Sequence, residues 1–144
     1  MFGLSKRVEK EEVAATTVAL IGEGYRRAYV KTLLGERAKV EAELASDKRA
    51  HMLAEIGPKV VIVDCASEGI NPLLALPKLA EIEGSPRIVA LTDGSVSPAL
   101  DAAALAPLGA DATADLRDGD AVRSAVLPDT SRPPRPRGRV LAAA

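Results

Sequence analysis

Short aliphatic runs recur along the chain, separated by stretches in which apolar residues have a helical spacing. Four consecutive β-branched residues at 60–63 are typical of a strand buried on both faces of a parallel sheet. Residues 38–44 instead alternate apolar and charged side chains, as in a strand with one exposed face. Together the runs predict five strands, at 17–21, 38–44, 60–63, 87–92 and 112–116.

A stretch with helical periodicity follows each predicted strand. In the first predicted helix, 25–36, the apolar face is formed by Val30, Leu33 and Leu34. Gly35 follows the last residues of this apolar face and is expected to end the helix. We expect the other faces of this helix to be solvated, with a basic patch made of Arg26, Arg27 and Lys31.

The later helices carry their own start and stop signals. The second is expected after a cap at Ser46 and ends at residues 57–58, a Gly-Pro pair. Pro77 should lie in the first turn of the third helix, 74–83, or kink it. The fourth follows a Ser-Pro start at 97–98 and the fifth begins near Asp118. The expected inward residues are Ala50, Leu53 and Ala54 in the second helix, Leu100, Ala103 and Ala104 in the fourth, and Val122, Ala125 and Val126 in the fifth.

The regular alternation of five strands and five helices predicts an α/β fold. Right-handed crossovers then favour a three-layer, doubly wound, five-stranded parallel sheet with the flavodoxin-like strand order 2-1-3-4-5. Residues 1–15 are mostly polar and are interpreted as an N-terminal extension to a domain at 16–127. Residues 128–144 are rich in Pro and Arg, and we expect a flexible tail there.

Composition excludes several classes of function. The 144 residues are 47% hydrophobic, which suits one domain with a core, and the formal net charge is -1. With that charge, two Tyr, one Phe and no Trp, no nucleic-acid partner is expected. One Cys and one His exclude an internal disulfide and Cys- or His-rich metal sites. The chain contains no apolar run of about 20 residues for a membrane span, and we expect a cytoplasmic location.

Three motifs carry a resemblance to a known family. Val60-Val61-Ile62-Val63-Asp64 ends a strand in an aspartate, Ile88-Val89-Ala90-Leu91-Thr92 ends the next in a threonine, and Gly109-Ala110-Asp111 precedes the last. In this order and spacing they resemble the receiver domains of bacterial two-component response regulators. The resemblance implies that Asp64 is the phosphoacceptor equivalent and that Thr92 and Thr113 hold the two switch positions.

The sequence departs from this family at the positions that carry charge. Receivers have an acidic pair after the first strand that holds Mg²⁺, and the equivalents here are Gly22 and Glu23. Glu23 and Asp64 are therefore the metal ligands if Mg²⁺ binding is retained. The family's lysine after the fifth strand falls on Leu116, and the neighbouring Arg117 should point elsewhere. Thr113 replaces the aromatic switch residue. These departures imply an atypical, degenerate receiver.

The resulting prediction is a signalling domain that acts mainly by protein-protein interaction and not as an enzyme, with a weak or absent phosphorylation site. The expected partner is a regulatory or signalling protein, or a second copy bound through the region Ala99 to Leu127. This region is rich in alanine, and small side chains permit close approach of another helix. No cofactor is expected, apart from Mg²⁺ if the phosphorylation site is active.

Two alternatives stay open. In the first, Asp64 accepts a phosphoryl group with Mg²⁺ held by Glu23, as in a working response regulator. In the second, the chain is a small-molecule or nucleotide sensor of flavodoxin-like fold, because Gly22-Glu23-Gly24 is similar to a dinucleotide-binding turn and Glu43 lies near the acidic position of such sites. Arg27 replaces the third glycine of that motif. Cys65 and His51 are interpreted as a buried thiol and an exposed imidazole without a special role.

Overall fold

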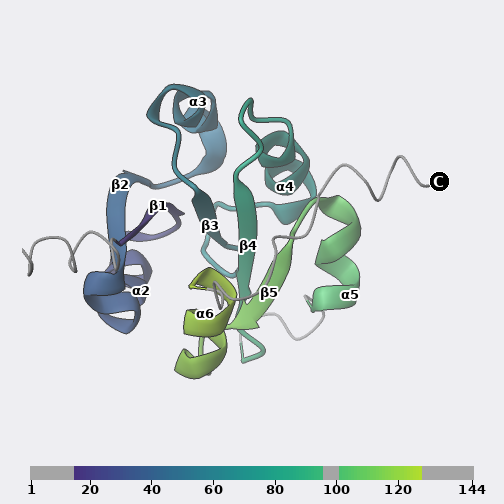
Figure 1. Ribbon diagram of the computed structural model, residues 1–144. Coiled ribbons are helices and arrows are strands. Elements are labelled where there is room, and N and C mark those ends of the chain that lie inside the picture. The colour runs from purple at the N-terminus through teal and green to yellow at the C-terminus, as the bar shows by residue number, and fades with distance from the viewer. Residues whose placement is uncertain (1–14, 96–100, 128–144) are drawn as a thin grey trace, which may run out of the picture.

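The computed structural model describes residues 15–95 and 101–127 and shows one parallel sheet between two layers of helices (Figure 1). The strands are β1 (Thr16–Ile21), β2 (Ala38–Leu44), β3 (Val60–Asp64), β4 (Arg87–Thr92) and β5 (Ala112–Asp115). They pair in parallel in the order β2-β1-β3-β4-β5. The predicted doubly wound fold with strand order 2-1-3-4-5 is confirmed.

Within residues 15–95 and 101–127, the strands are accompanied by five helices and three short 3₁₀ segments. The helices are α2 (Gly24–Leu34), α3 (Leu53–Ile56), α4 (Pro72–Ala80), α5 (Ala102–Leu105) and α6 (Gly119–Val126) in the described ranges. The 3₁₀ segments are η1 (Gly35–Arg37), η2 (Asp47–Met52) and η3 (Ala106–Leu108). None of the helices in the described ranges is long and apolar enough to cross a membrane.

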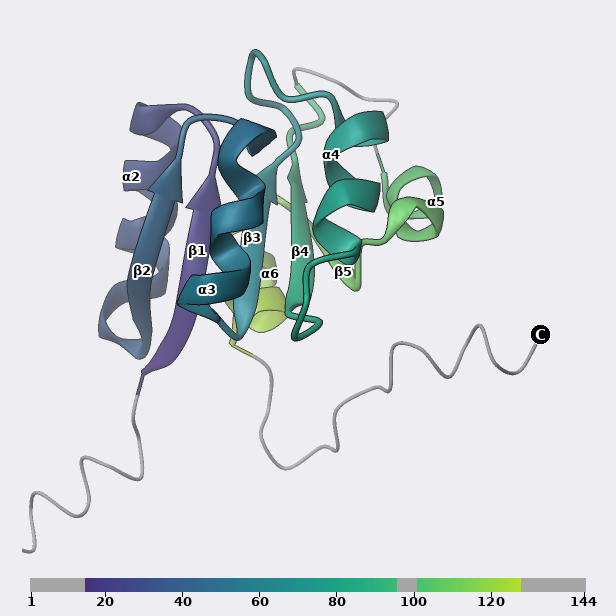
Figure 2. The ribbon, with the colours of Figure 1, turned by 90° about the horizontal axis from the view of Figure 1, so that it is seen from above.

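Helices cover both faces of the sheet (Figure 2), and each face has its own apolar core. Val30 and Leu34 of α2 pack with α6 against one face. On the other face, Leu53 of α3, Leu76 of α4 and Leu105 of α5 are fully buried. All five residues of β3 are buried, because this central strand is covered by both helical layers. The edge strand β2 instead alternates between exposed and half-buried residues, as its sequence pattern predicts.

The second and third helices differ in detail from the sequence-based expectation. A 3₁₀ segment, η2, precedes the short α3, with Ser46 as its N-cap. Because of this tighter winding, Ala54 is exposed rather than inward-facing. Helix α4 begins at Pro72, two residues before the predicted start, and Pro77 lies in its interior. The proline of its first turn is therefore Pro72 and not Pro77.

The fourth helix also has a different start. Ser97, Pro98 and Leu100 lie outside the described residues. Helix α5 begins at Ala102, and the carboxylate of Asp101 caps it by accepting a hydrogen bond from the Ala104 backbone N–H at 3.0 Å. In this register Ala103 and Ala104 are exposed and Leu105 is fully buried, so the predicted inward face of this helix was wrong.

The predicted N-terminal extension and the Pro/Arg-rich tail lie outside the described residues, apart from Ala15. The fifth helix agrees with its expectation. Asp118 caps α6 through the Ala121 backbone N–H, and Val122 and Val126 are fully buried.

Candidate functional site

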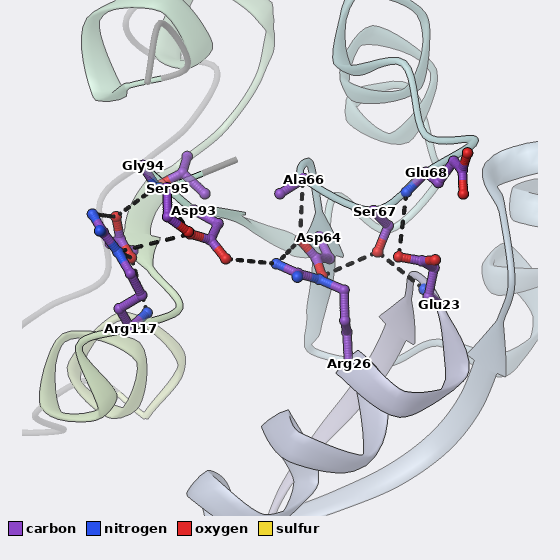
Figure 3. A network of polar contacts seen from close by, with 12 residues as sticks. Glu23, Arg26, Asp64, Ala66, Ser67, Glu68, Asp93, Gly94, Ser95 and Arg117 are labelled. Atoms are coloured by element: carbon purple, nitrogen blue, oxygen red, sulfur yellow. Dashed lines mark hydrogen bonds and ion pairs between the residues drawn. The ribbon is translucent and has the colours of Figure 1, made fainter. Parts of the chain in front are cut away.

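The polar edge of the sheet lies where the parallel strands end at their carboxyl termini, the usual position of ligand sites in doubly wound folds. Asp64 is the last residue of β3 and pairs in register with Leu91 of β4. Thr92 and Asp93 follow at the end of β4, and Asp115 ends β5. The three aspartates therefore come to one edge, and Figure 3 shows two of them, Asp64 and Asp93, in a connected polar network.

The carboxylate of Asp64 is buried and accepts four hydrogen bonds. Arg26 donates from Nε to Oδ2 and from Nη2 to Oδ1, the second at 3.3 Å. The Ala66 backbone N–H donates to Oδ1 and the Ser67 hydroxyl donates to Oδ2, both at 3.0 Å. A carboxylate offers about four lone-pair directions, so these donors use its full accepting capacity.

Arg26 lies in the first turns of α2 and is buried, with only 9% of its surface exposed. Its Nη2 also lies 3.5 Å from Oδ2 of Asp93, so one guanidinium bridges the ends of β3 and β4 (Figure 3). Burial by itself lowers the pKa of Arg26, but the hydrogen bond and the charge of Asp64 outweigh it, and the pKa is raised above its ordinary value. The guanidinium is therefore a permanent positive charge in the site.

The expectation that Arg26 is solvated was wrong, and the helical spacing contained the signal that corrects it. Arg26 precedes Val30 by four positions and Leu34 by eight, so these three residues share the buried face of α2. Side chains on a helix point toward its N-terminus, which here directs the Arg26 side chain to the polar edge of the sheet. Arg27, one position on, instead bonds Glu43 at 3.0 Å outside the site.

Gly22 is held next to Asp64 and has no room for a side chain. A Cβ atom at this position would lie 2.9 Å from the Ser67 hydroxyl and 3.0 Å from Cβ of Asp64. Ser67 uses that space: its hydroxyl donates to Asp64 and accepts from the Glu23 backbone N–H at 3.0 Å. A serine from the loop after β3 therefore fills the space beside Gly22, the position at which the family resemblance implies a carboxylate.

The Glu23 side chain connects two turns at this edge of the sheet. Its Oε2 accepts a hydrogen bond from the Glu68 backbone N–H at 3.4 Å, which ties the turn after β1 to the loop after β3. Glu23 and Asp64, the pair that the resemblance implies as metal ligands, are thus each hydrogen-bonded to the loop after β3. With Arg26 covering both oxygens of Asp64, the residues present do not fit Mg²⁺ in the way that the family resemblance implies.

A second set of ion pairs continues the network along the ends of β4 and β5. The carboxylate of Asp93 accepts hydrogen bonds from the hydroxyl and the backbone N–H of Ser95, and these, together with Arg26, lower its pKa. Arg117 donates from Nη2 to Oδ2 of Asp115 at 2.8 Å and lies 3.7 Å from Asp93. Its hydrogen bonds lower the pKa of Asp115 well below the usual range.

The position expected to carry the family's lysine holds a core residue. Leu116 is 6% exposed and packs in the apolar cluster with α2 and α6. The neighbouring Arg117 points away from Asp64, as expected, and pairs with Asp115 and Asp93 at the rim. The Arg117 guanidinium passes so close to the loop after β4 that a Cβ on Gly94 would lie 2.5 Å from its Nη2.

The two threonines at the switch-equivalent positions have different surroundings. Thr92 is buried, and its hydroxyl donates to the Ala114 carbonyl at 3.5 Å. Thr113 is half-buried on β5 and pairs in register with Ala90. Beside Asp64, burial raises the pKa of the Cys65 thiol to about 12, which makes it unreactive.

The nucleotide-site interpretation of the turn after β1 loses its acidic residue in the structure. The Glu43 carboxylate is engaged by Arg27 and by Nζ of Lys31, at 3.0 and 2.8 Å. A nucleotide ribose would therefore have to compete with two cations for this carboxylate. His51 is exposed, as expected.

No family model and no curated protein matches this sequence. Solved structures do match. The signal receiver domain of NarL from Mycobacterium tuberculosis is similar with a TM-score of 0.63 and 17% identity, over 78% of this chain and 94% of that one. The receiver domain of AraT from Geobacillus stearothermophilus has a TM-score of 0.62 and 15% identity, over 78% and 90%. The crystal structure of the P1 domain of CheA3 in complex with CheY6, from R. sphaeroides, is similar with a TM-score of 0.59 and 22% identity. The match covers 91% of this chain and 99% of that one.

At these identities the likeness concerns the fold. The sheet has the parallel order β2-β1-β3-β4-β5 that the sequence predicts, and an aspartate ends its central strand. This chain has the fold of the receiver domains of response regulators.

Proposed function

We propose that this chain is an atypical receiver-like signalling domain that acts by contact with another protein and in which Asp64 is a weak or silent phosphoacceptor. The observation that carries the proposal is the ion pair of Arg26 with both oxygens of Asp64. The fold is that of signalling modules, and the carboxylate that would react, Asp64, is already bonded to Arg26 of the same chain.

Phosphoryl transfer to an aspartate depends on a free carboxylate oxygen and on cations that neutralise the phosphoryl oxygens. Here Arg26, Ala66 and Ser67 occupy the accepting positions of Asp64. A buried ion pair also resists opening, because each charge left alone in the interior is strongly unfavourable. The transfer must therefore break this pair before Asp64 can attack, which makes it slow.

The proposed contact surface is the region Ala99 to Leu127, of which residues 101–127 are described. In that part α5 and η3 expose small side chains, namely Ala102, Ala103, Ala104, Ala106 and Pro107. Small residues let the backbone of another element approach closely. The complex of CheY6 with the P1 domain of CheA3 is a protein contact made by a chain of similar fold, and it supports a regulatory or signalling protein as the partner class here.

The test is incubation of the full chain with acetyl phosphate and Mg²⁺, followed by intact-mass measurement. We expect no phosphoryl adduct, and an Asp64→Asn variant that binds its cellular partner as the wild type does. Capture from the native cell with wild type and Asp64→Asn as paired baits measures this directly. A rapid adduct on Asp64, or loss of partner binding by an Asp64→Asn chain that circular dichroism shows to be folded, would favour the working response regulator instead.

A further inference from the structure

The site contains a positive charge that neither the fold nor the motifs require. The guanidinium of Arg26 is buried between two carboxylates that come from different strands, Asp64 at the end of β3 and Asp93 after β4. The side chains of these three residues are only 10%, 5% and 12% exposed. Two buried carboxylates that share one donor atom need a cation between them, because their mutual repulsion and their desolvation both oppose folding.

We infer that Arg26 is a tethered internal cation that takes the place of a divalent metal ion between Asp64 and Asp93. The wild-type site is then closed to Mg²⁺ and Mn²⁺, and it is held in one state whatever the metal concentration. Removal of the Arg26 side chain exposes a site for a hard divalent cation with Asp64 and Asp93 as its ligands.

The ligand pair follows from the shared donor. Nη2 of Arg26 is 3.3 Å from Oδ1 of Asp64 and 3.5 Å from Oδ2 of Asp93, so both oxygens border the same position. Carboxylate oxygens are the ligands that Mg²⁺ and Mn²⁺ prefer, and water molecules can complete the coordination of such an ion. Glu23 is not assigned to this pair, because the guanidinium of Arg26 bonds to Asp64 and Asp93, whereas the Glu23 carboxylate accepts from the Glu68 backbone N–H.

The guanidinium and a metal ion exclude each other, since both use the same oxygens. A tethered group is favoured in this competition because it acts at high effective concentration. A site that is open in about 1% of wild-type molecules binds its metal roughly 100-fold more weakly than a site that is always open. We expect a difference of this size between the wild type and a chain without the Arg26 side chain.

The experiment compares the full chain with Arg26→Ala and, as a matched control, Arg27→Ala. Arg27 is the next residue on the same helix, but it pairs with Glu43 outside the site. Mn²⁺ binding is measured by electron paramagnetic resonance, and thermal unfolding is recorded in EDTA and in millimolar Mg²⁺. We expect one saturable Mn²⁺ per chain and a Mg²⁺-dependent rise in Tm for Arg26→Ala only.

Further variants assign the ligands. Arg26→Ala combined with Asp93→Asn should lose the Mn²⁺ site, whereas Arg26→Ala combined with Glu23→Gln should keep it. If Arg26→Ala does not fold in EDTA, Arg26→Gln retains side-chain N–H donors without the charge, and it is expected to fold and to bind Mn²⁺. Failure of both variants to fold with the metal present would overturn the inference.

Two other outcomes also overturn it: a wild-type chain that binds Mn²⁺ as tightly as Arg26→Ala, or a folded Arg26→Ala that binds none. These results are separate from the phosphorylation test. A silent Asp64 with no metal site in Arg26→Ala would refute the inference about the tethered cation and leave the proposed signalling function standing.

Discussion

The Arg26 guanidinium covers both carboxylate oxygens of Asp64 across 38 positions of sequence, with Nε on Oδ2 and Nη2 on Oδ1. Helix α2 thereby places a positive charge at the carboxyl edge of the sheet, between carboxylates from β3 and from the residue after β4. The same side chain reaches Asp93 and so connects the ends of β3 and β4. The Arg26–Asp64 ion pair therefore limits which reactions the Asp64 carboxylate can undergo.

Deletion of the Arg26 side chain should lower the free energy of unfolding by about 3–5 kcal/mol, because it leaves a buried carboxylate unpaired. Arg26→Ala is the test, measured by urea denaturation near neutral pH without divalent ions. The control is Arg27→Ala, which removes a more exposed pair with Glu43 and should cost below about 1 kcal/mol. Equal losses in the two variants would show that the Asp64 pair has no special weight.

Acid should destabilise the protein through Asp93. Its pKa is lowered in the folded state, first by the Ser95 hydroxyl and then by the Ser95 backbone N–H and Arg26. A lowered folded-state pKa gives stability that is present above the unfolded value of about 4 and is lost as the pH falls through the folded value. We therefore expect the unfolding free energy to decline below about pH 4, and the decline to be shallower in Asp93→Asn.

The control for this acid effect is Ser95→Ala, which removes the strongest of these hydrogen bonds. In that variant the Asp93 carboxyl should titrate at a higher pH than in the wild type, as followed by its ¹³C chemical shift. An unchanged midpoint would contradict the assignment of the pKa shift to the Ser95 hydroxyl.

Restoring the acidic pair of the family by Gly22→Asp should not restore a metal site. The new side chain would overlap the Ser67 hydroxyl, and such overpacking costs about 1–3 kcal/mol. Gly22→Asp combined with Ser67→Gly should recover part of this loss, because the second change vacates the space. Chemical denaturation of the four chains in a double-mutant cycle measures the coupling; strict additivity would show that the contact is not the cause.

A bulky charge on α5 should disrupt the proposed partner contact without affecting the fold. Ala103→Arg places an exposed guanidinium on this surface, and we expect lost partner binding with stability within about 0.5 kcal/mol of wild type. Ala28→Arg, at an exposed position of α2 on another part of the molecule, is the matched control. Binding is measured by pull-down and by light scattering for a second copy; retained binding in Ala103→Arg would exclude this surface.

The hydrophobic pattern by itself determined the architecture. A run such as 60–64 can be buried on both faces only at the centre of a covered sheet, and the alternation at 38–44 indicates a strand with one exposed face. Because parallel strands end at one edge, the placement of Asp64 and Thr92 on that edge also follows from order and spacing. These features depend on local periodicity, which the sequence states directly.

Tertiary structure decided which partner each polar side chain finds. The helical spacing could put Arg26 on the inner face of α2, but only the packing of α2 against the sheet brings its side chain to Asp64 and Asp93. The contact of Gly22 with Ser67 likewise joins two turns that are distant in sequence. Such pairings depend on how elements pack in three dimensions, and periodicity along the chain contains no information about distances between elements.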